Sequence, residues 1–344
     1  MTGFWTAIAA ILIFCILVFV HELGHFITAK LLRIRVHEFA IGMGPKLFGK
    51  QKGETLYSVR ALPIGGFCAL EGEDNSSTDE RALSNKPAWI KFIVLVAGSF
   101  MNLLLGLLLL LLLYSSAKSV VVPEIGAVDA GGAAGTAGLS VGDEIIAVNG
   151  NRIHIAADLY WEKSKLTASP ADITIRRNGE QQKITILPKK TEQGLSLGIR
   201  LSQRENSFGL TVKTSFYNTV FYGKVVLETF IDLLRGKVSV QNMSGPIGIV
   251  SEIGTAVEQT AKTGWPGFLS LLQLTILLTI NLGVFNLLPI PALDGGRIFF
   301  VFVELVRRKP LPPEKEGIVH MVGLALLLLL SLVVAYMDVI KLLV

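Results

Sequence analysis

The stretch that decides the fold runs from Phe4 to Leu32 and reads FWTAIAAILIFCILVFVHELGHFITAKLL. It is apolar over more than the roughly 20 helical residues needed to cross about 30 Å of hydrocarbon. Met1 to Phe19 contains no Lys or Arg, so the stretch lacks the basic start of a cleaved signal peptide. The sequence therefore predicts a retained membrane-spanning helix.

Three further stretches are long and apolar enough to span a membrane, at about 89–114, 268–293 and 317–336. The chain is 51% hydrophobic and 17% charged, with a mean hydropathy of +0.56, which argues against a soluble protein. We therefore expect a polytopic α-helical membrane protein with about four transmembrane helices. The formal net charge of +5 does not indicate a nucleic-acid partner, because the basic residues crowd beside the apolar stretches.

The basic residues also predict an orientation in the membrane. They are concentrated between spans one and two, from Arg33 to Lys91, and between spans three and four, from Arg307 to Lys315. Short loops rich in Lys and Arg stay on the cytoplasmic side. We therefore expect both termini, and the long region between spans two and three, to be extracytoplasmic.

The first span contains the motif His21-Glu22-Leu-Gly-His25. Positions i and i+4 share one face of a helix, so His21 and His25 can bind one metal ion. Glu22 beside them can act as a general base. Ionisable side chains inside a membrane span are costly, and their presence by default indicates a function.

A third metal ligand is expected near the end of the third span. No charged residue occurs from Thr263 to Leu293, and Asp294 follows directly. Pro289 and Pro291 remove backbone donors and break the helix before it. Non-helical backbone at membrane depth is tolerated where it is packed in protein or lines a wet cavity.

The region between spans two and three predicts a small β-rich domain at 118–200. It contains the hairpin signal Asn178-Gly179 between two alternating strands, and a short helix at 156–164. Residues 218–235 have the pattern of an amphipathic helix. A second β-rich element is expected in the Gly-rich stretch 41–68, where we predict a membrane-associated β-hairpin whose exposed edge lies at 57–59.

These motifs together resemble the site-2 protease family of intramembrane zinc metalloproteases, and are most similar to its bacterial RseP type. Besides HELGH, the resemblance rests on segments that cover nearly the whole chain: Gly42-x-Gly44-Pro45, Pro63-x-Gly65-Gly66-Phe67, Ala97-Gly98-Ser99-x-x-Asn102, Ser244-Gly245-Pro246 and Asn286-x-x-Pro289-x-Pro291-x-Leu293-Asp294-Gly295. Ser99 stands where the family usually has Pro, and this departure touches no expected ligand.

The resemblance implies one Zn²⁺ bound by His21, His25 and Asp294, with Glu22 as the base. It implies an endopeptidase that cleaves transmembrane protein substrates, such as anti-sigma factors or remnant signal peptides, in a bacterial cytoplasmic membrane. The expected substrate-binding residues are Asn286, Pro289, Pro291, Gly42, Gly44, Gly65, Gly66, Tyr57, Ser58 and Val59. The domain at 118–200 resembles a single PDZ domain, which either filters substrates by size or binds a peptide.

Four segments follow from this interpretation. They are two spans with the HELGH motif and the hairpin (1–117), the PDZ-like domain (118–200), a juxtamembrane connector (201–262), and the last two spans (263–344). Asn102 and His320 are expected to serve helix packing.

Two other functions stay open, a membrane-anchored PDZ scaffold with a structural metal and a transporter with a broken helix. The intact Glu22 argues against the scaffold, and the lack of an evident inverted repeat argues against the transporter.

Overall fold

The computed structural model describes residues 2–73, 75–129, 131–191, 194–237, 245–309, 311 and 313–343. The chain forms two compact units. One contains Met1–Leu109 and Tyr222–Val344, and the other contains Leu110–Phe221. Ser244 of the Ser-Gly-Pro segment lies outside the described residues.

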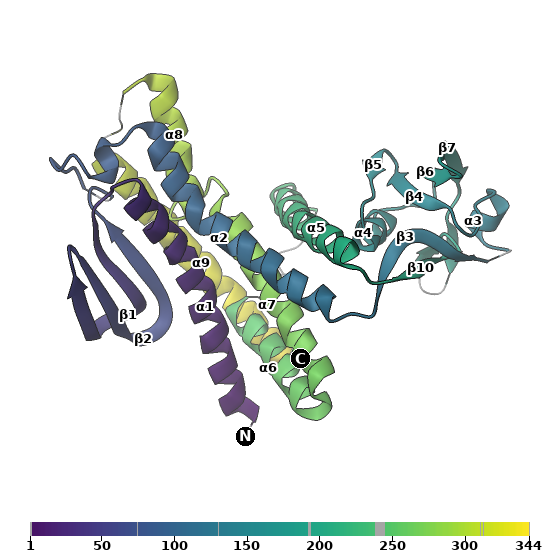
Figure 1. Cartoon of the computed structure of the whole chain (residues 1–344), viewed down its shortest axis with the longest axis horizontal. Helices are drawn as coiled ribbons and strands as arrows, with labels where there is room; N and C mark the ends of the chain where they lie inside the picture. Colours follow the sequence, from purple (N-terminus) through teal and green to yellow (C-terminus); the bar gives the residue numbers. More distant parts are fainter. Residues whose placement is uncertain are drawn as a thin grey trace. The chain divides into compact units, whose positions relative to one another are not determined.

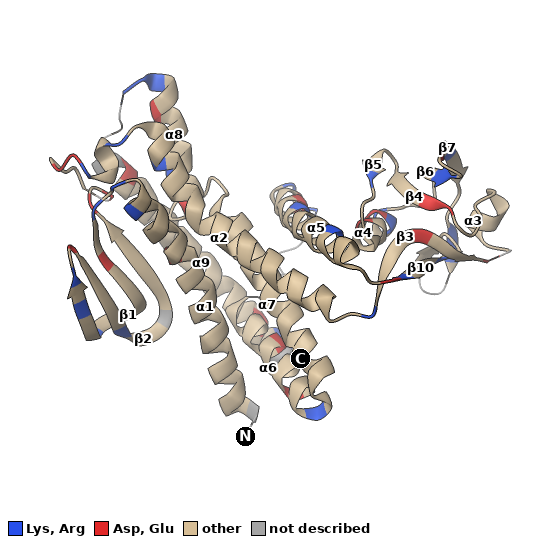
Figure 2. Cartoon of the chain, in the orientation of Figure 1, with Lys and Arg blue, Asp and Glu red and all other residues tan. Residues whose placement is uncertain are grey.

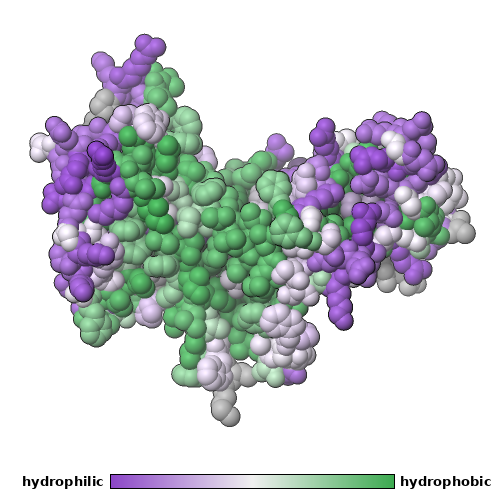
Figure 3. Space-filling view, viewed as in Figure 1, coloured by the Kyte–Doolittle hydropathy of each residue, from purple (hydrophilic) through white to green (hydrophobic). Residues whose placement is uncertain are grey.

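The first unit is built on long apolar helices. Four of them, α1 (Thr2–Leu31), α2 (Ala88–Ser115), α7 (Trp265–Asn286) and α9 (Pro313–Leu343), have the length and composition to cross a membrane. The predicted spans are therefore confirmed as helices, and Figure 3 shows the apolar surface that they give this unit. Apolar surface on this scale suits a lipid environment.

The third predicted span is shorter than expected. Helix α7 ends at Asn286, and a turn with both prolines leads into the separate helix α8 (Asp294–Arg307). Proline cannot donate a helical hydrogen bond, so the helix cannot continue through this segment. Asp294 is therefore the first residue of a new helix and does not end the third span.

The predicted connector contains two helices, α5 (Phe208–Leu234) and α6 (Pro246–Thr263). The predicted helix at 218–235 is confirmed as the second half of α5. Helix α6 lies along α7 and α1 (Figure 1). Its first turn is capped by Asp338 of α9, whose carboxylate accepts hydrogen bonds from the backbone N–H groups of Gly245 (3.1 Å) and Gly248 (2.8 Å). A carboxylate at a helix N-terminus satisfies donors that have no partner within the helix.

The hairpin consists of two long, bent antiparallel strands, β1 (Val36–Lys52) and β2 (Thr55–Leu70). Each strand folds back on the other, so that Phe39 pairs with both Cys68 and Tyr57. Gly42, Gly44 and Gly65 lie at the bends with φ values of 84°, 82° and 85°. This left-handed backbone is readily adopted by glycine and costly for other residues.

The fold-back places the predicted edge in the middle of the layer. Tyr57 pairs with Phe39 on one side and Lys50 on the other, and Ser58 and Val59 are likewise paired on both sides. The prediction that residues 57–59 present a free edge is therefore wrong. Among the described residues, 66–70 and 48–52 pair on one side only and form the two edges.

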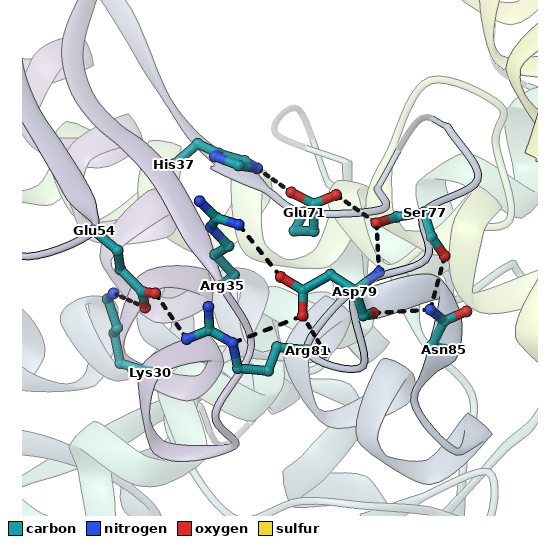
Figure 4. Close-up of polar contacts among 9 residues, drawn as sticks. All are labelled: Lys30, Arg35, His37, Glu54, Glu71, Ser77, Asp79, Arg81 and Asn85. Atoms are coloured by element: carbon teal, nitrogen blue, oxygen red, sulfur yellow. Dashed lines mark hydrogen bonds and ion pairs between the residues drawn. The ribbon is translucent and has the colours of Figure 1, made fainter.

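Polar contacts fasten the hairpin to the end of α1 and to the loop that follows β2 (Figure 4). Glu54, in the turn between β1 and β2, accepts hydrogen bonds from Lys30 of α1 (3.2 Å) and from Arg81 (2.8 Å). His37 of β1 contacts Glu71, which follows β2. Surface ion pairs of this kind add little stability singly, but together they restrict where the edge at 66–70 can lie.

The second unit contains an antiparallel sheet of order β10-β3-β4-β6-β7, with β5 paired to β4. Its elements are β3 (Ser119–Val128), α3 (Ala133–Thr136), β4 (Glu144–Val148), β5 (Asn151–Arg152), α4 (Ala156–Ser164), β6 (Ala171–Arg177), β7 (Glu180–Ile186), β8 (Lys189–Thr191), β9 (Gly194–Ser196) and β10 (Ile199–Glu205). The predicted helix at 156–164 and the Asn178-Gly179 turn are confirmed. The domain extends to Glu205 rather than 200, because β10 pairs with β3 along its length.

This sheet encloses a core of aliphatic side chains that includes Ile125, Ile145 and Ile173. At its margin, Arg177 donates two hydrogen bonds of 2.7 Å to the carboxylate of Asp143. This contact holds the pKa of the Asp143 carboxyl below its usual range. The region whose alternating pattern predicted a β-rich domain thus forms a domain with its own hydrophobic core.

Candidate active site

The two histidines of the first helix lie next to each other in the interior of the helical unit. His21 and His25 are both buried, and their Nε2 atoms are 3.2 Å apart. Helix α2 approaches closely here because glycines line the contact. An added Cβ at Gly24 would lie 2.3 Å from the Ala97 carbonyl oxygen, and one at Gly98 would lie 2.3 Å from His25 Nε2.

Asp294 completes a triangle of candidate ligand atoms. Its Oδ2 lies 3.1 Å from His21 Nε2 and 3.4 Å from His25 Nε2. Ligand atoms about 2.0–2.2 Å from a tetrahedral zinc ion are themselves about 3.4 Å apart, so the triangle has the size that zinc requires. Within the part of the chain that the structure describes, these three residues are the group of His, Cys, Asp and Glu side chains that could hold a metal.

Groups on α2 orient both imidazole rings. His25 Nδ1 lies 2.8 Å from the Val94 carbonyl oxygen, and this contact requires a proton on Nδ1 and leaves Nε2 free to bind metal. His21 Nδ1 lies 3.3 Å from the amide group of Asn102, which is fully buried. Metal binding through His21 Nε2 requires Nδ1–H to donate, so Asn102 must turn its amide oxygen toward the ring.

The sequence predicts that Asn102 bridges helices, and in the structure it also contacts His21, the first candidate metal ligand. Its amide oxygen is buried and has no hydrogen-bond partner within the described residues, and a turned amide would give this oxygen the Nδ1–H of His21 as a donor. The sequence signal was its place in the Ala-Gly-x-x-x-Asn segment of an apolar span. A polar residue there indicates a function but does not identify the contact.

Glu22 lies beside the triangle and not within it. Its side chain lines a cavity of about 400 Å³ together with His25, Cys68, Asp294 and Arg297. The cavity wall includes residues 67–70, which form one edge of the hairpin, and an added Cβ at Gly66 would lie 3.8 Å from Glu22 Cγ. One cavity is thus bordered by an edge strand of the hairpin, by the carboxyl group of Glu22 and by the ligand triangle.

Arg297 and Glu73 were not identified from the sequence, and the structure brings both to this cavity. They form an ion pair across its wall, and Glu73 also accepts a hydrogen bond from the Leu70 backbone N–H (3.3 Å). The pair therefore links the hairpin edge to the first turn of α8. Sequence reasoning had no signal for it, because the two residues are far apart in the chain.

The other predicted substrate-binding residues divide into two groups. Asn286 lies at the end of α7 with its amide nitrogen 3.5 Å from His21 Nε2, and Pro289 and Pro291 shape the turn that leads to Asp294. By contrast, Gly42 and Gly44 lie at the bend of the hairpin, and Tyr57, Ser58 and Val59 line a separate hollow on it. The structure therefore brings Asn286 and Gly66 to the site but not residues 57–59.

Comparison with known proteins identifies the family. The model for "Peptidase family M50" matches residues 9–330. The chain belongs to peptidase family M50. It is a zinc metalloprotease of the site-2 protease type, and its cofactor is Zn²⁺.

Relatives of this M50 peptidase match it over nearly their whole length. A candidate zinc metalloprotease of Fusobacterium nucleatum is 38% identical, over 98% of this chain and 99% of the relative. The zinc metalloprotease RasP of Geobacillus kaustophilus is 31% identical, over 97% of each chain. The regulator of sigma-W protease RasP of Bacillus subtilis is 30% identical, over 97% of this chain and 98% of the relative. Four apolar helices and bacterial relatives make this chain a bacterial membrane protein.

Proposed function

We propose that this M50 peptidase is an endopeptidase that hydrolyses peptide bonds within or near transmembrane segments of other proteins. The observation that carries the proposal is the triangle of His21, His25 and Asp294 beside Glu22, at a cavity between apolar helices. Ionisable side chains within membrane-spanning segments mark functional sites and substrate pathways, which supports a substrate that itself lies in the membrane. The decisive experiment compares wild type and Glu22→Gln on a single-span test substrate in detergent.

In this proposal each residue of the site has one task. His21, His25 and Asp294 hold the metal, with their orientation set by Asn102 and the Val94 carbonyl. Zinc, when bound, supplies Lewis-acid chemistry that polarises the scissile carbonyl and activates water. Glu22 takes the proton of the attacking water and delivers it to the leaving amine. The cavity beside Glu22 gives the water a place to bind.

The substrate must be unwound before it is cut, because helical carbonyls are already hydrogen-bonded. We propose that the edge at 66–70 holds the unwound segment by strand addition, since it borders the cavity. The bend of the hairpin exposes the large apolar side chains of Met43 (49% exposed) and Leu62 (56%), and the adjoining edge exposes Phe48 (75%). These side chains support a hairpin whose bend enters the lipid.

A photocrosslinker at Ala69 should capture substrate, whereas one at Lys50 should not. Both positions lie on edges of the same hairpin, but only Ala69 borders the cavity. The crosslinker would be placed in Glu22→Gln protein, so that the bound substrate is not cut. Equal capture at both positions would contradict the assignment of the edge.

The distribution of charge supports the proposed orientation. Figure 2 shows Lys and Arg on α8 and on the hairpin. The site adjoins both elements, because Asp294 is the first residue of α8 and residues 67–70 of the hairpin line the cavity beside Glu22. By the preference of basic residues for the cytoplasmic side, these elements and the site face the cytoplasm. The β-rich domain and both termini then lie outside, and the domain is a PDZ-like module that meets the substrate's external part.

Removing the β-rich domain should show whether it filters substrates by size or binds a peptide. Asn206 donates hydrogen bonds to the backbone oxygens of Tyr114 (2.7 Å) and Ala117 (3.0 Å), so the two ends of the domain lie close together. Residues 119–205 can therefore be replaced by a short Gly-Ser linker. If the domain is a size filter, the truncated enzyme will cut substrates with a bulky external domain that wild type leaves intact. Loss of cleavage of short substrates in a folded, zinc-loaded protein would instead support peptide binding.

A further inference from the structure

The last helix contacts the turn that carries the third metal ligand. His320 on α9 accepts a hydrogen bond at Nδ1 from the Ala292 backbone N–H, 2.8 Å away. One turn further along, Gly323 packs on Pro291 so closely that an added Cβ would lie 2.3 Å from the proline Cβ and 2.9 Å from its carbonyl oxygen. Residues three apart share a helix face, so both contacts come from one side of α9.

The backbone of this turn needs such support. Ala292 has a φ of 77°, a left-handed conformation that is unfavourable for a residue with a side chain. Conformations of this kind persist where surrounding contacts enforce them. Ala292 lies two residues before Asp294, so a relaxation of the turn would move the start of α8 and the carboxylate with it.

The first turn of α8 is also packed tightly onto the same segment. An added Cβ at Gly295 would lie 2.0 Å from the Leu288 carbonyl oxygen, and one at Gly296 would lie 2.6 Å from that of Ile290. The ring of His320 is flanked by Phe300 of α8, with ring centroids 5.7 Å apart. The turn is therefore held between α8 on one side and α9 on the other.

We propose that His320 is a positioning residue for the zinc site. It fixes the Ala292 backbone and, together with Gly323, sets the position from which Asp294 reaches His21 and His25. This inference rests on the proposed role of Asp294 as a ligand. In this view α9 determines the geometry of the metal site, besides anchoring the chain in the membrane.

The test uses two replacements that differ in the hydrogen bond. Asparagine at 320 can place its amide oxygen near the position of Nδ1 and accept from Ala292, whereas leucine cannot accept. His320→Leu should weaken zinc binding about 10- to 100-fold in competition with a chelator, the range seen when outer-shell partners are lost. His320→Asn should recover most of that loss. The absorption spectrum of cobalt-loaded protein should change in His320→Leu and return toward wild type in His320→Asn.

A pair of glycine variants on the same helix provides the matched control. Gly323→Ala places a methyl group against Pro291 and should weaken zinc binding, whereas Gly317→Ala meets nothing within 4 Å and should not. Size-exclusion behaviour and thermal unfolding in detergent would verify that each variant is folded. If His320→Leu fails to fold, the comparison of Gly323→Ala with Gly317→Ala still tests whether α9 sets the geometry of the zinc site.

Wild-type zinc affinity in folded His320→Leu, or in folded Gly323→Ala, would overturn the proposal. Equal weakening in the Asn and Leu variants would also overturn it, because the hydrogen bond would then have no part. Failure of the underlying ligand assignment gives a different result, since Asp294→Ala itself would then retain zinc.

Discussion

Glu22→Gln is expected to reduce the rate of peptide-bond hydrolysis by about 10²- to 10⁴-fold, the usual contribution of a general base. Glutamine keeps the size and polarity of the side chain but cannot accept a proton. Glu22 lies beside the ligand triangle without belonging to it, so the variant should retain zinc at wild-type stoichiometry. Single-turnover cleavage of a single-span substrate in detergent, with zinc content measured on the same sample, would check both statements.

The matched control for this variant is Glu252→Gln, which makes the same chemical change at an exposed position on α6. It should cleave at the wild-type rate. Equal activity of Glu22→Gln and wild type would contradict the proposed mechanism and would point to another base. Loss of zinc together with activity would assign Glu22 to the metal site instead.

Asp294→Ala is expected to remove zinc as well as activity. Two histidines are fewer protein ligands than catalytic zinc sites use, and the substitution would leave only those two. Because losing an outer-shell partner already costs 10- to 100-fold in metal affinity, losing a ligand should weaken zinc binding by more than about 100-fold. Chelator competition followed by elemental analysis would measure the loss, and excess zinc should restore little activity.

Asp172→Ala is a suitable control for the loss of a carboxylate. Asp172 lies in the β-rich domain, where it pairs with Lys183 at 2.7 Å, and its removal should leave zinc binding unchanged. An Asp294→Ala protein that retains zinc with wild-type affinity would show that another residue completes the site. Asn286, whose amide lies 3.5 Å from His21 Nε2, would then be the first residue to test.

Several features of this protein follow from local sequence alone. The spans are predictable because long apolar stretches have few alternatives to membrane helices. His21 and His25 can be paired because residues i and i+4 on a helix are always neighbours. The break before Asp294 is predictable because Pro289 and Pro291 cannot continue a helix.

In the hairpin, local sequence predicts the strands but not which of them lies at the edge. Its glycines and alternating residues predicted strands, but residues 57–59 were placed on an edge and the structure pairs them on both sides. The edge is decided by how two long strands fold back on each other, and no local pattern specifies that path. As a result, the strand that borders the cavity is 66–70 and not 57–59.

Local sequence patterns were sufficient to predict the four apolar helices, the pairing of His21 and His25 on one face of α1, and Asp294 as the remaining candidate ligand. The side chains that contact these candidate ligands and their supporting turn depend on the tertiary fold. Asn102 reaches His21 from α2, and His320 reaches Ala292 from α9, across 81 and 28 residues of chain. The physical reason is that helix periodicity acts over a few residues, whereas contacts between helices depend on close approach at glycines such as Gly98 and Gly323.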